Sequence, residues 1–175
     1  QILARDPSSI EALNILVQFL LATGKIDEAR LYLNKSRNIE SDNYETISDL
    51  ANSYQVAGDT SSARMYYQKA ISINGSYAPA LTNLGNLKLN EGNKEEALHL
   101  LIKATISDPQ LAPAWGNLAN CYIQLGKLQE AEVSIRKSIK INPNLFKSHF
   151  LLAIILIKQQ KLQEAEQPLR KAIEL

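Results

Sequence analysis

The sequence contains little of what disulfide frameworks, membrane spans and nucleic-acid surfaces require. Its single cysteine cannot form an internal disulfide, which fits a reducing compartment. The longest apolar run, 150–157, is eight residues, whereas a membrane-spanning helix needs about 20. With 19 basic and 18 acidic residues the net charge is +1, so no strong field attracts phosphate backbones. We therefore expect a cytoplasmic chain that has neither a membrane nor a nucleic acid as its partner.

No residues stand at the spacings that catalysis or metal binding requires. The two histidines, His99 and His149, belong to no Ser/His/Asp set or metal-ligand cluster, and the sequence has no phosphate-binding loop. Cys121 falls beside core positions of a predicted helix, where a cysteine behaves as a small hydrophobic residue. We expect this segment to have no catalytic residues, no cofactor and no metal.

The chain repeats a unit of 34 residues, seen most clearly at 112–145. This unit has a proline near a helix start, apolar residues at helical spacing, a glycine break, a second helical pattern and a final Asn-Pro. The unit recurs without insertion at 10–43, 44–77, 78–111 and 146–175, the last being truncated, and residues 1–9 fit the tail of a preceding repeat. The period predicts one continuous all-α solenoid of five helix-turn-helix repeats with a partial N-terminal helix.

The same residue types recur at equivalent positions of the repeats. One position holds Leu16, Leu50, Leu84, Leu118 and Leu152, a second holds Ala29, Ala63, Ala97, Ala131 and Ala165, and the turn holds Gly24, Gly58, Gly92 and Gly126. Trp115, Leu118, Ala119 and Tyr122 fit the pattern W-x2-L-G/A-x2-Y. Over nearly its whole length the chain resembles the tetratricopeptide repeat (TPR) family, which implies antiparallel helix pairs in a right-handed superhelix. The run Lys-Leu-Gln-Glu-Ala-Glu, at 127–132 and 161–166, resembles TPR arrays that are common in bacteria, especially cyanobacteria.

Two of the departures from the family pattern concern the packing of a helix pair and the turn between its helices. Lys88 occupies the place where Tyr54 and Tyr122 fill the helix pair, so we expect looser packing there and an ammonium group that reaches water. Gln160 replaces the turn glycine of the fifth repeat, so that turn must adopt another geometry or hold glutamine at an unfavourable φ.

Polar residues on the leading helices form the candidate peptide-binding surface. Stacked repeats would align one row of Asp49, Asn83 and Asn117 and a second row of Asn52, Asn86 and Asn120, with Gln124 on the same face. An Asn amide offers two donors and an acceptor, so it can pair with a peptide unit whatever side chain the ligand carries. The resemblance implies the same use, because leading helices line the concave face of TPR proteins, and asparagine rows grip peptide backbones in the TPR arm of O-GlcNAc transferases. The alternative is that these residues, common in the repeat consensus, bond only within the array.

The sequence favours a carboxylate ligand or RNA less than it favours an extended peptide backbone. A carboxylate clamp of the kind found in some TPR proteins would use positions that hold Thr82, Asn86, Asn117, Lys147 and Leu151 here, and two of its cations are absent. RNA-reading helical repeats depend on a basic groove. Here the predicted groove is of mixed charge, with Glu11, Glu45 and Asp49 as well as Lys147 and Lys158.

The helix predicted at 146–157 is apolar nearly all round. Counting faces places Leu152, Ala153 and Leu156 in the core and leaves Phe150, Ile154 and Ile157 uncovered on the concave side. Such a surface usually marks an interaction site, so we expect it to contact a partner, a missing C-terminal segment or a second copy of the chain. For the isolated segment we favour self-association through this C-terminal repeat.

Two classes of function fit these residues. The favoured one is a non-catalytic scaffold that binds a peptide or protein partner in its concave groove. The alternative is a substrate-recruiting arm of a larger enzyme such as a glycosyltransferase. The full-length gene would separate the two, because only an arm requires a catalytic domain elsewhere in the protein.

Overall fold

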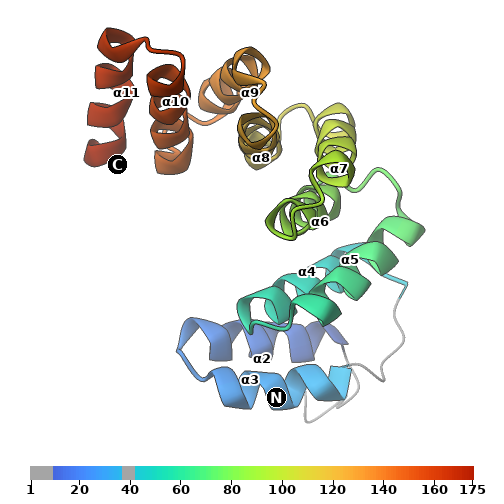
Figure 1. The fold of residues 1–175 in the computed structure, drawn as a ribbon. Coiled ribbons are helices and arrows are strands. Elements are labelled where there is room, and N and C mark those ends of the chain that lie inside the picture. The colour runs from blue at the N-terminus through green and yellow to red at the C-terminus, as the bar shows by residue number, and fades with distance from the viewer. Residues whose placement is uncertain (1–9, 37–41) are drawn as a thin grey trace. The chain divides into compact units, whose positions relative to one another are not determined.

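The computed structural model describes residues 10–36 and 42–175, and all regular structure in these ranges is helical (Figure 1). The leading helices of the five pairs are α2 (Ile10–Ala22), α4 (Tyr44–Val56), α6 (Ala78–Asn90), α8 (Ala112–Gln124) and α10 (Phe146–Lys158). The trailing helices are α3 (Ile26–Ser36), α5 (Thr60–Ile73), α7 (Lys94–Ser107), α9 (Leu128–Ile141) and α11 (Leu162–Glu174). The predicted all-α class is therefore confirmed. The partial helix predicted before Ile10 lies outside the described residues.

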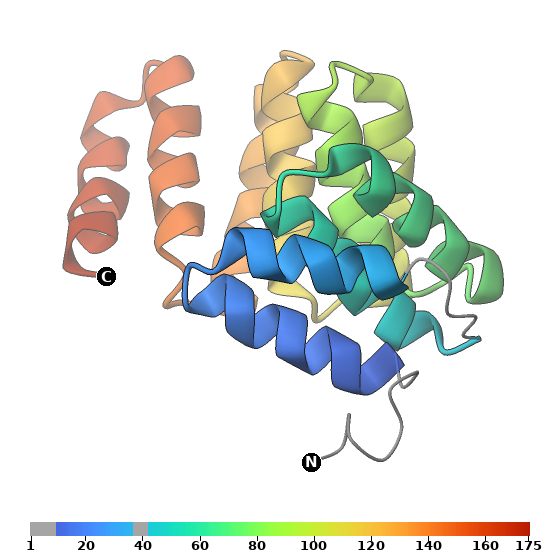
Figure 2. The ribbon, with the colours of Figure 1, turned by 90° about the horizontal axis from the view of Figure 1, so that it is seen from below.

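The chain divides into two compact units, 1–80 and 81–175. In the first unit α2 packs on α3 and α4 packs on α5, and α4 also contacts both α2 and α3. In the second unit α8 packs on α9 and α10 packs on α11, while α7 contacts α8, and α10 contacts both α8 and α9. The members of each pair run antiparallel (Figure 2). None of the described helices is long and apolar enough to cross a membrane. The expectation of one continuous solenoid stays a prediction.

Small residues allow the helices of each pair to approach closely. The alanines at the recurring trailing-helix position are all buried, from Ala29, Ala63, Ala97 and Ala131 at 0% exposure to Ala165 at 2%. In the third pair the approach is closer still, because a Cβ added to Gly85 would lie 2.8 Å from Leu101 Cγ. Larger side chains at these positions would force the helices apart. Each pair is thus fixed by residues that have little or no side chain.

The larger side chains that fill each pair differ between repeats. In the second pair the Tyr54 hydroxyl donates to the Leu33 carbonyl, and its ring stacks on Tyr66 with centroids 5.2 Å apart. At the equivalent place Lys88 is 9% exposed and its ammonium lies 3.0 Å from the Glu96 carboxylate of α7. The ammonium group of Lys88 therefore pairs with a carboxylate, whereas the sequence predicted that it reaches water. Burying a cation is costly unless it is paired, and Glu96 supplies that partner.

Every described turn between a leading and a trailing helix uses the same two hydrogen bonds. In the fourth repeat the Gly126 N–H donates to Ile123 and the Lys127 N–H donates to Tyr122, which is the Schellman motif. The fifth repeat repeats both bonds from Gln160 and Lys161, at 2.9 Å each. Gln160 has φ 64° where Gly126 has φ 74°. Of the two alternatives, the turn therefore keeps its geometry and glutamine takes the left-handed conformation.

We predict that Gln160→Gly raises the free energy of unfolding by about 1 kcal/mol. The left-handed conformation costs a non-glycine residue roughly 1–2 kcal/mol, and the substitution removes this cost. Glycine also has more conformational freedom in the unfolded chain, which reduces the net gain in stability. Urea denaturation measures the change. The matched control is Gly126→Gln, which meets no atom within 4 Å and should lose a similar amount. An unchanged midpoint for Gln160→Gly would contradict the assigned strain.

Candidate peptide-binding surface

The second compact unit brings three leading helices together. Leu89 of α6 shares a core cluster with Leu118 and Cys121 of α8, and α10 contacts α8 directly. The apolar face of α10 packs into a second cluster, which includes Leu152 of α10 and Ala119 of α8. The opposite faces of α6, α8 and α10 take no part in these two clusters. On α8 the predicted residues Asn117, Asn120 and Gln124 follow one another at helical spacing along such a face.

Three asparagine amides of this unit have no partner within the described chain. Asn86, Asn117 and Asn120 are half-buried, and none of their side chains hydrogen-bonds to a residue in 10–36 or 42–175. Gln124 is exposed at the end of α8, where its backbone carbonyl accepts from Lys94 Nζ at 2.9 Å and its side chain hydrogen-bonds to no described residue. These amides are positioned by packed helices without being used by the packing. They are the members of the predicted rows whose side-chain amides form no hydrogen bond with a described residue.

Other members of the predicted rows interact within the protein. The Tyr67 hydroxyl lies 2.5 Å from Asn52 Oδ1 and 2.8 Å from Gln55 Oε1. A hydroxyl has one proton, so it donates to one of these two amides, and Asn52 takes part in joining α4 to α5. Asn83 also interacts within the protein. For these two residues the alternative of bonding inside the array has support.

The predicted residues Asp49 and Asn52 belong to the first compact unit, where α4 carries acidic groups. Asp49 is exposed overall, but the packed helix partly shields its carboxyl from water. This partial desolvation and, secondly, the nearby Glu45 raise its pKa above the ordinary value of 3.8. Burial raises the pKa of Tyr77 as well, and the carboxylates of Asp49 and Glu45 add to that effect. The first unit therefore presents carboxylates on α4, whereas the second presents amides on α6 and α8.

The cysteine and one histidine have structural roles. Cys121 is fully buried, its Sγ lies 3.6 Å from the Lys94 carbonyl, and burial raises the pKa of its thiol. The thiol stays uncharged at neutral pH, which makes it a poor nucleophile. The His149 ring nitrogen Nε2 lies 2.7 Å from the Pro143 carbonyl, just as Trp115 Nε1 donates to Pro109 at 3.0 Å. His149 thus replaces the tryptophan in its hydrogen bond.

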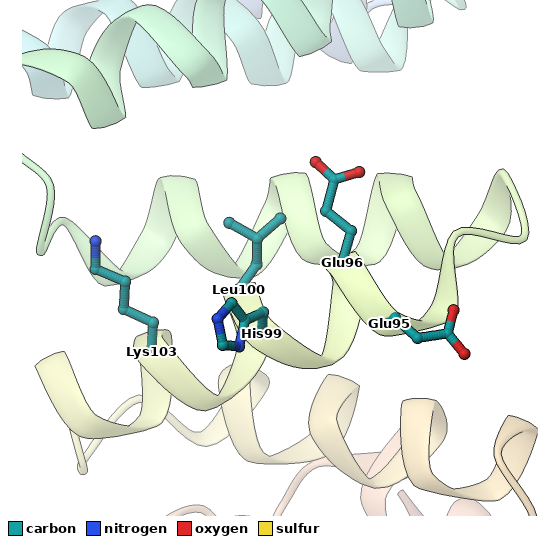
Figure 3. Close-up of a pocket in the computed structure, with 5 residues that line it drawn as sticks. All are labelled: Glu95, Glu96, His99, Leu100 and Lys103. Atoms are coloured by element: carbon teal, nitrogen blue, oxygen red, sulfur yellow. The ribbon is translucent and has the colours of Figure 1, made fainter.

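One open hollow lies along α7 and is lined by Glu95, Glu96, His99, Leu100 and Lys103. All five side chains come from the same helix, and the two carboxylates point away from each other (Figure 3). Glu96 is already paired with Lys88. Among the described residues there is no group of three or more His, Cys, Asp or Glu side chains that could hold a metal ion. The hollow carries no constellation for catalysis.

The predicted apolar patch lies on α10. Phe150 and Ile157 are each 45% exposed and Ile154 is half-buried, whereas Leu152 and Leu156 are buried. Sequence reasoning missed Phe146, which is 47% exposed and stacks its ring on Phe150 with centroids 5.9 Å apart. Aromatic residues four apart on a helix face are neighbours, so the spacing of the two phenylalanines could have indicated this pair.

Comparison with known proteins identifies the repeat. A model of the family described as "Cilia and flagella-associated protein 70 C-terminal domain", which is of the tetratricopeptide type, matches residues 9–175. The chain belongs to this family. The predicted resemblance to TPR proteins is thereby confirmed. The narrower resemblances to cyanobacterial arrays and to O-GlcNAc transferase arms stay predictions.

Solved structures show the same fold at low identity. PilF of Pseudomonas aeruginosa is 24% identical with a TM-score of 0.80, and the match covers 98% of this chain and 78% of that one. MamA of Desulfovibrio magneticus RS-1 is 20% identical with a TM-score of 0.75, and the match covers 95% of this chain and 94% of that one. Identities this low support the helical repeat fold and nothing about ligands. No curated protein matches the sequence.

We predict that Asp49→Asn stabilises the protein at pH 7 and has no effect at pH 3. Because the folded-state pKa of Asp49 is raised, folding disfavours its ionised form, and stability falls as pH rises from the ordinary value of 3.8 through the folded-state pKa. An uncharged amide lacks this loss. Urea denaturation at both pH values measures the difference, with Asp42→Asn at an exposed position outside the helices as control. A difference of equal size at pH 3 and pH 7 would rule out the titration of Asp49 as its cause.

Proposed function

We propose that the chain is a non-catalytic protein-interaction scaffold that binds an extended peptide across α6 and α8. The observation that supports this is the set of three half-buried amides on these helices, Asn86, Asn117 and Asn120, which have no partner in the described chain. Each can donate to a peptide carbonyl and accept from a peptide N–H, so recognition does not depend on the ligand's side chains. A substrate-recruiting arm of a larger enzyme would use the same surface, and the full-length gene separates these two cases.

Helix geometry sets the length of peptide that the amides engage. Asn117 and Asn120 are three residues apart on α8, so about 4.5 Å of axial rise separates them. Packed helices lie roughly 8–10 Å apart, and we take this general spacing for the step from Asn86 on α6 to Asn120 on α8, because the two helices share a core cluster. An extended chain advances about 3.3 Å per residue, so a peptide crossing both helices would meet a new amide about every third residue.

We predict that Asn86→Ala combined with Asn120→Ala weakens peptide binding about tenfold or more. Two amide pairs, each contributing roughly 0.5–1.5 kcal/mol, are lost, while substitutions that break no interaction within the protein usually change stability by about 0.5 kcal/mol or less. The probe is a peptide selected on the wild-type protein from a random library, and calorimetry gives its affinity.

The matched control is Asn34→Ala with Asn144→Ala, two exposed asparagines outside the leading helices. Their removal should leave affinity unchanged. Wild-type affinity in the Asn86 and Asn120 variant would remove these amides from the proposed site. A large fall in its melting temperature would instead indicate that they stabilise the array.

The exposed apolar residues of α10 favour a second candidate function, self-association. Phe150 and Ile157 are uncovered in the single chain, and burying apolar surface gains roughly 25 cal/mol per Å². Two copies that join through this patch would cover it on both sides in an isologous contact. The patch is the only support for this candidate, so the test must address the patch directly.

We predict that Ile154→Glu with Ile157→Glu abolishes any concentration-dependent sedimentation of the wild-type chain. The substitution removes apolar surface from the contact and adds the cost of burying charged groups there. The control, Ile106→Glu with Val133→Glu, changes two exposed residues of trailing helices, at 73% and 59% exposure. It should sediment like the wild type. Monomers for all three proteins at equal stability would show that the patch drives no association.

A further inference from the structure

The exposed face of α10 combines apolar residues with a cation at each end. Lys147, Phe150, Ile154, Ile157 and Lys158 follow one another at intervals of three, four, three and one, which places them along one side of the helix. We call these five residues the α10 face. Its two lysines are both exposed and are 11 residues apart, about 16 Å along the helix axis. The apolar side chains lie between them.

Neither lysine of the α10 face has an acidic partner among the described residues, whereas three other lysines of the second unit do. Lys88 pairs with Glu96 at 3.0 Å, Lys161 with Glu132 at 3.0 Å, and Lys171 with Glu174 at 3.3 Å. Among the described residues neither Lys147 nor Lys158 forms such a pair. The sequences of α6, α8 and α10 contain no Asp or Glu, so the neighbouring leading helices offer no carboxylate.

Self-association is supported by the apolar patch alone, and the charges of the α10 face weigh against it. Parallel pairing of two α10 faces would place Lys147 beside its counterpart, and antiparallel pairing would place Lys147 beside the other copy's Lys158. Either arrangement brings like charges together at both ends of the contact, which selects against the pairing. An anionic membrane would gain only two lysines, whereas lipid-binding segments carry clusters of roughly four to eight.

We propose that the α10 face binds an amphipathic helix of a partner protein, with apolar residues at its centre and a carboxylate near each end. This narrows the partner class of the proposed scaffold but uses none of its asparagine amides. Phe150, Ile154 and Ile157 form a ridge of the kind that packs into the groove of another helix. Carboxylates about 11 residues apart on the incoming helix would then meet both lysines.

The test uses a labelled helical peptide of about 15 residues with a leucine stripe and two glutamates near each end. Two relatives of this peptide carry lysines in place of the glutamates or serines in place of the leucines. Fluorescence anisotropy should show that the glutamate peptide binds about tenfold more tightly than either relative, and that this preference shrinks as salt is added.

Reversing the charges of the face is the decisive variant. Lys147→Glu with Lys158→Glu should bind the lysine peptide better than the glutamate peptide. The control, Lys103→Glu with Lys140→Glu, makes the same change of net charge on α7 and α9 and should keep the wild-type preference. Circular dichroism checks that each variant is folded.

Several outcomes would overturn the proposal. These are equal binding of both charged peptides by the wild type, full binding of the serine peptide, and a wild-type preference in the reversed variant. Binding to phosphatidylserine vesicles without binding to the glutamate peptide would assign the face to a membrane and overturn it too.

The asparagine variant separates this inference from the function on which it builds. Asn86→Ala with Asn120→Ala should leave the affinity for the helical peptide unchanged, and its loss there would overturn the inference. If that variant keeps its affinity for the library-selected peptide while the lysine reversal acts as expected, the extended-peptide site fails and the α10 face stands.

Discussion

The close approach of two helices within each pair is the constraint on which the rest of the structure depends. It requires a residue with almost no side chain at the contact, and Ala97 and Gly85 of the third repeat show how strictly the space is limited. Once a pair is fixed in this way, it buries only one side of its leading helix against the trailing helix and the next repeat. The other side must face something outside the repeat, so the surface available for partners is a consequence of the packing.

That surface differs between repeats because the packing does not determine it. In the second unit α6 and α8 present amides and α10 presents apolar residues with lysines, although all three helices occupy the same place in their repeats. Positions beside the core tolerate exchange as well, since His149 makes the carbonyl hydrogen bond that Trp115 makes one repeat earlier. The fold thus supplies equivalent positions, and the residues placed there supply the chemistry.

The fold could be predicted from the sequence because its signal is repeated. A single glycine or alanine is weak support for a turn or a helix contact, but the same residue type every 34 residues indicates one unit used many times. Features that depend on a single residue, without such repetition, were harder to predict. The partner of Lys88 is Glu96, eight residues later on another helix, and no periodicity points to that pair. For Gln160 two geometries were open, and the conserved hydrogen bonds of the turn decided in favour of the positive φ.

The positions of the candidate site residues could be predicted from the sequence, but whether each amide is already hydrogen-bonded could not. Spacing alone placed Asn52 and Asn86 at equivalent positions, yet only one of them has a hydroxyl, that of Tyr67, beside its amide. Whether an amide is available depends on the side chain that the trailing helix brings to it, which a pattern on the leading helix does not contain.

The local distribution of charge could not be predicted from the total charge either. The net charge of +1 is the sum of unevenly placed groups: α4 carries carboxylates, among them Asp49, and α10 carries two lysines that pair with no carboxylate among the described residues. A partner that contacts a few side chains responds to the local charge within about a Debye length, so the near-neutral total does not predict which partner binds.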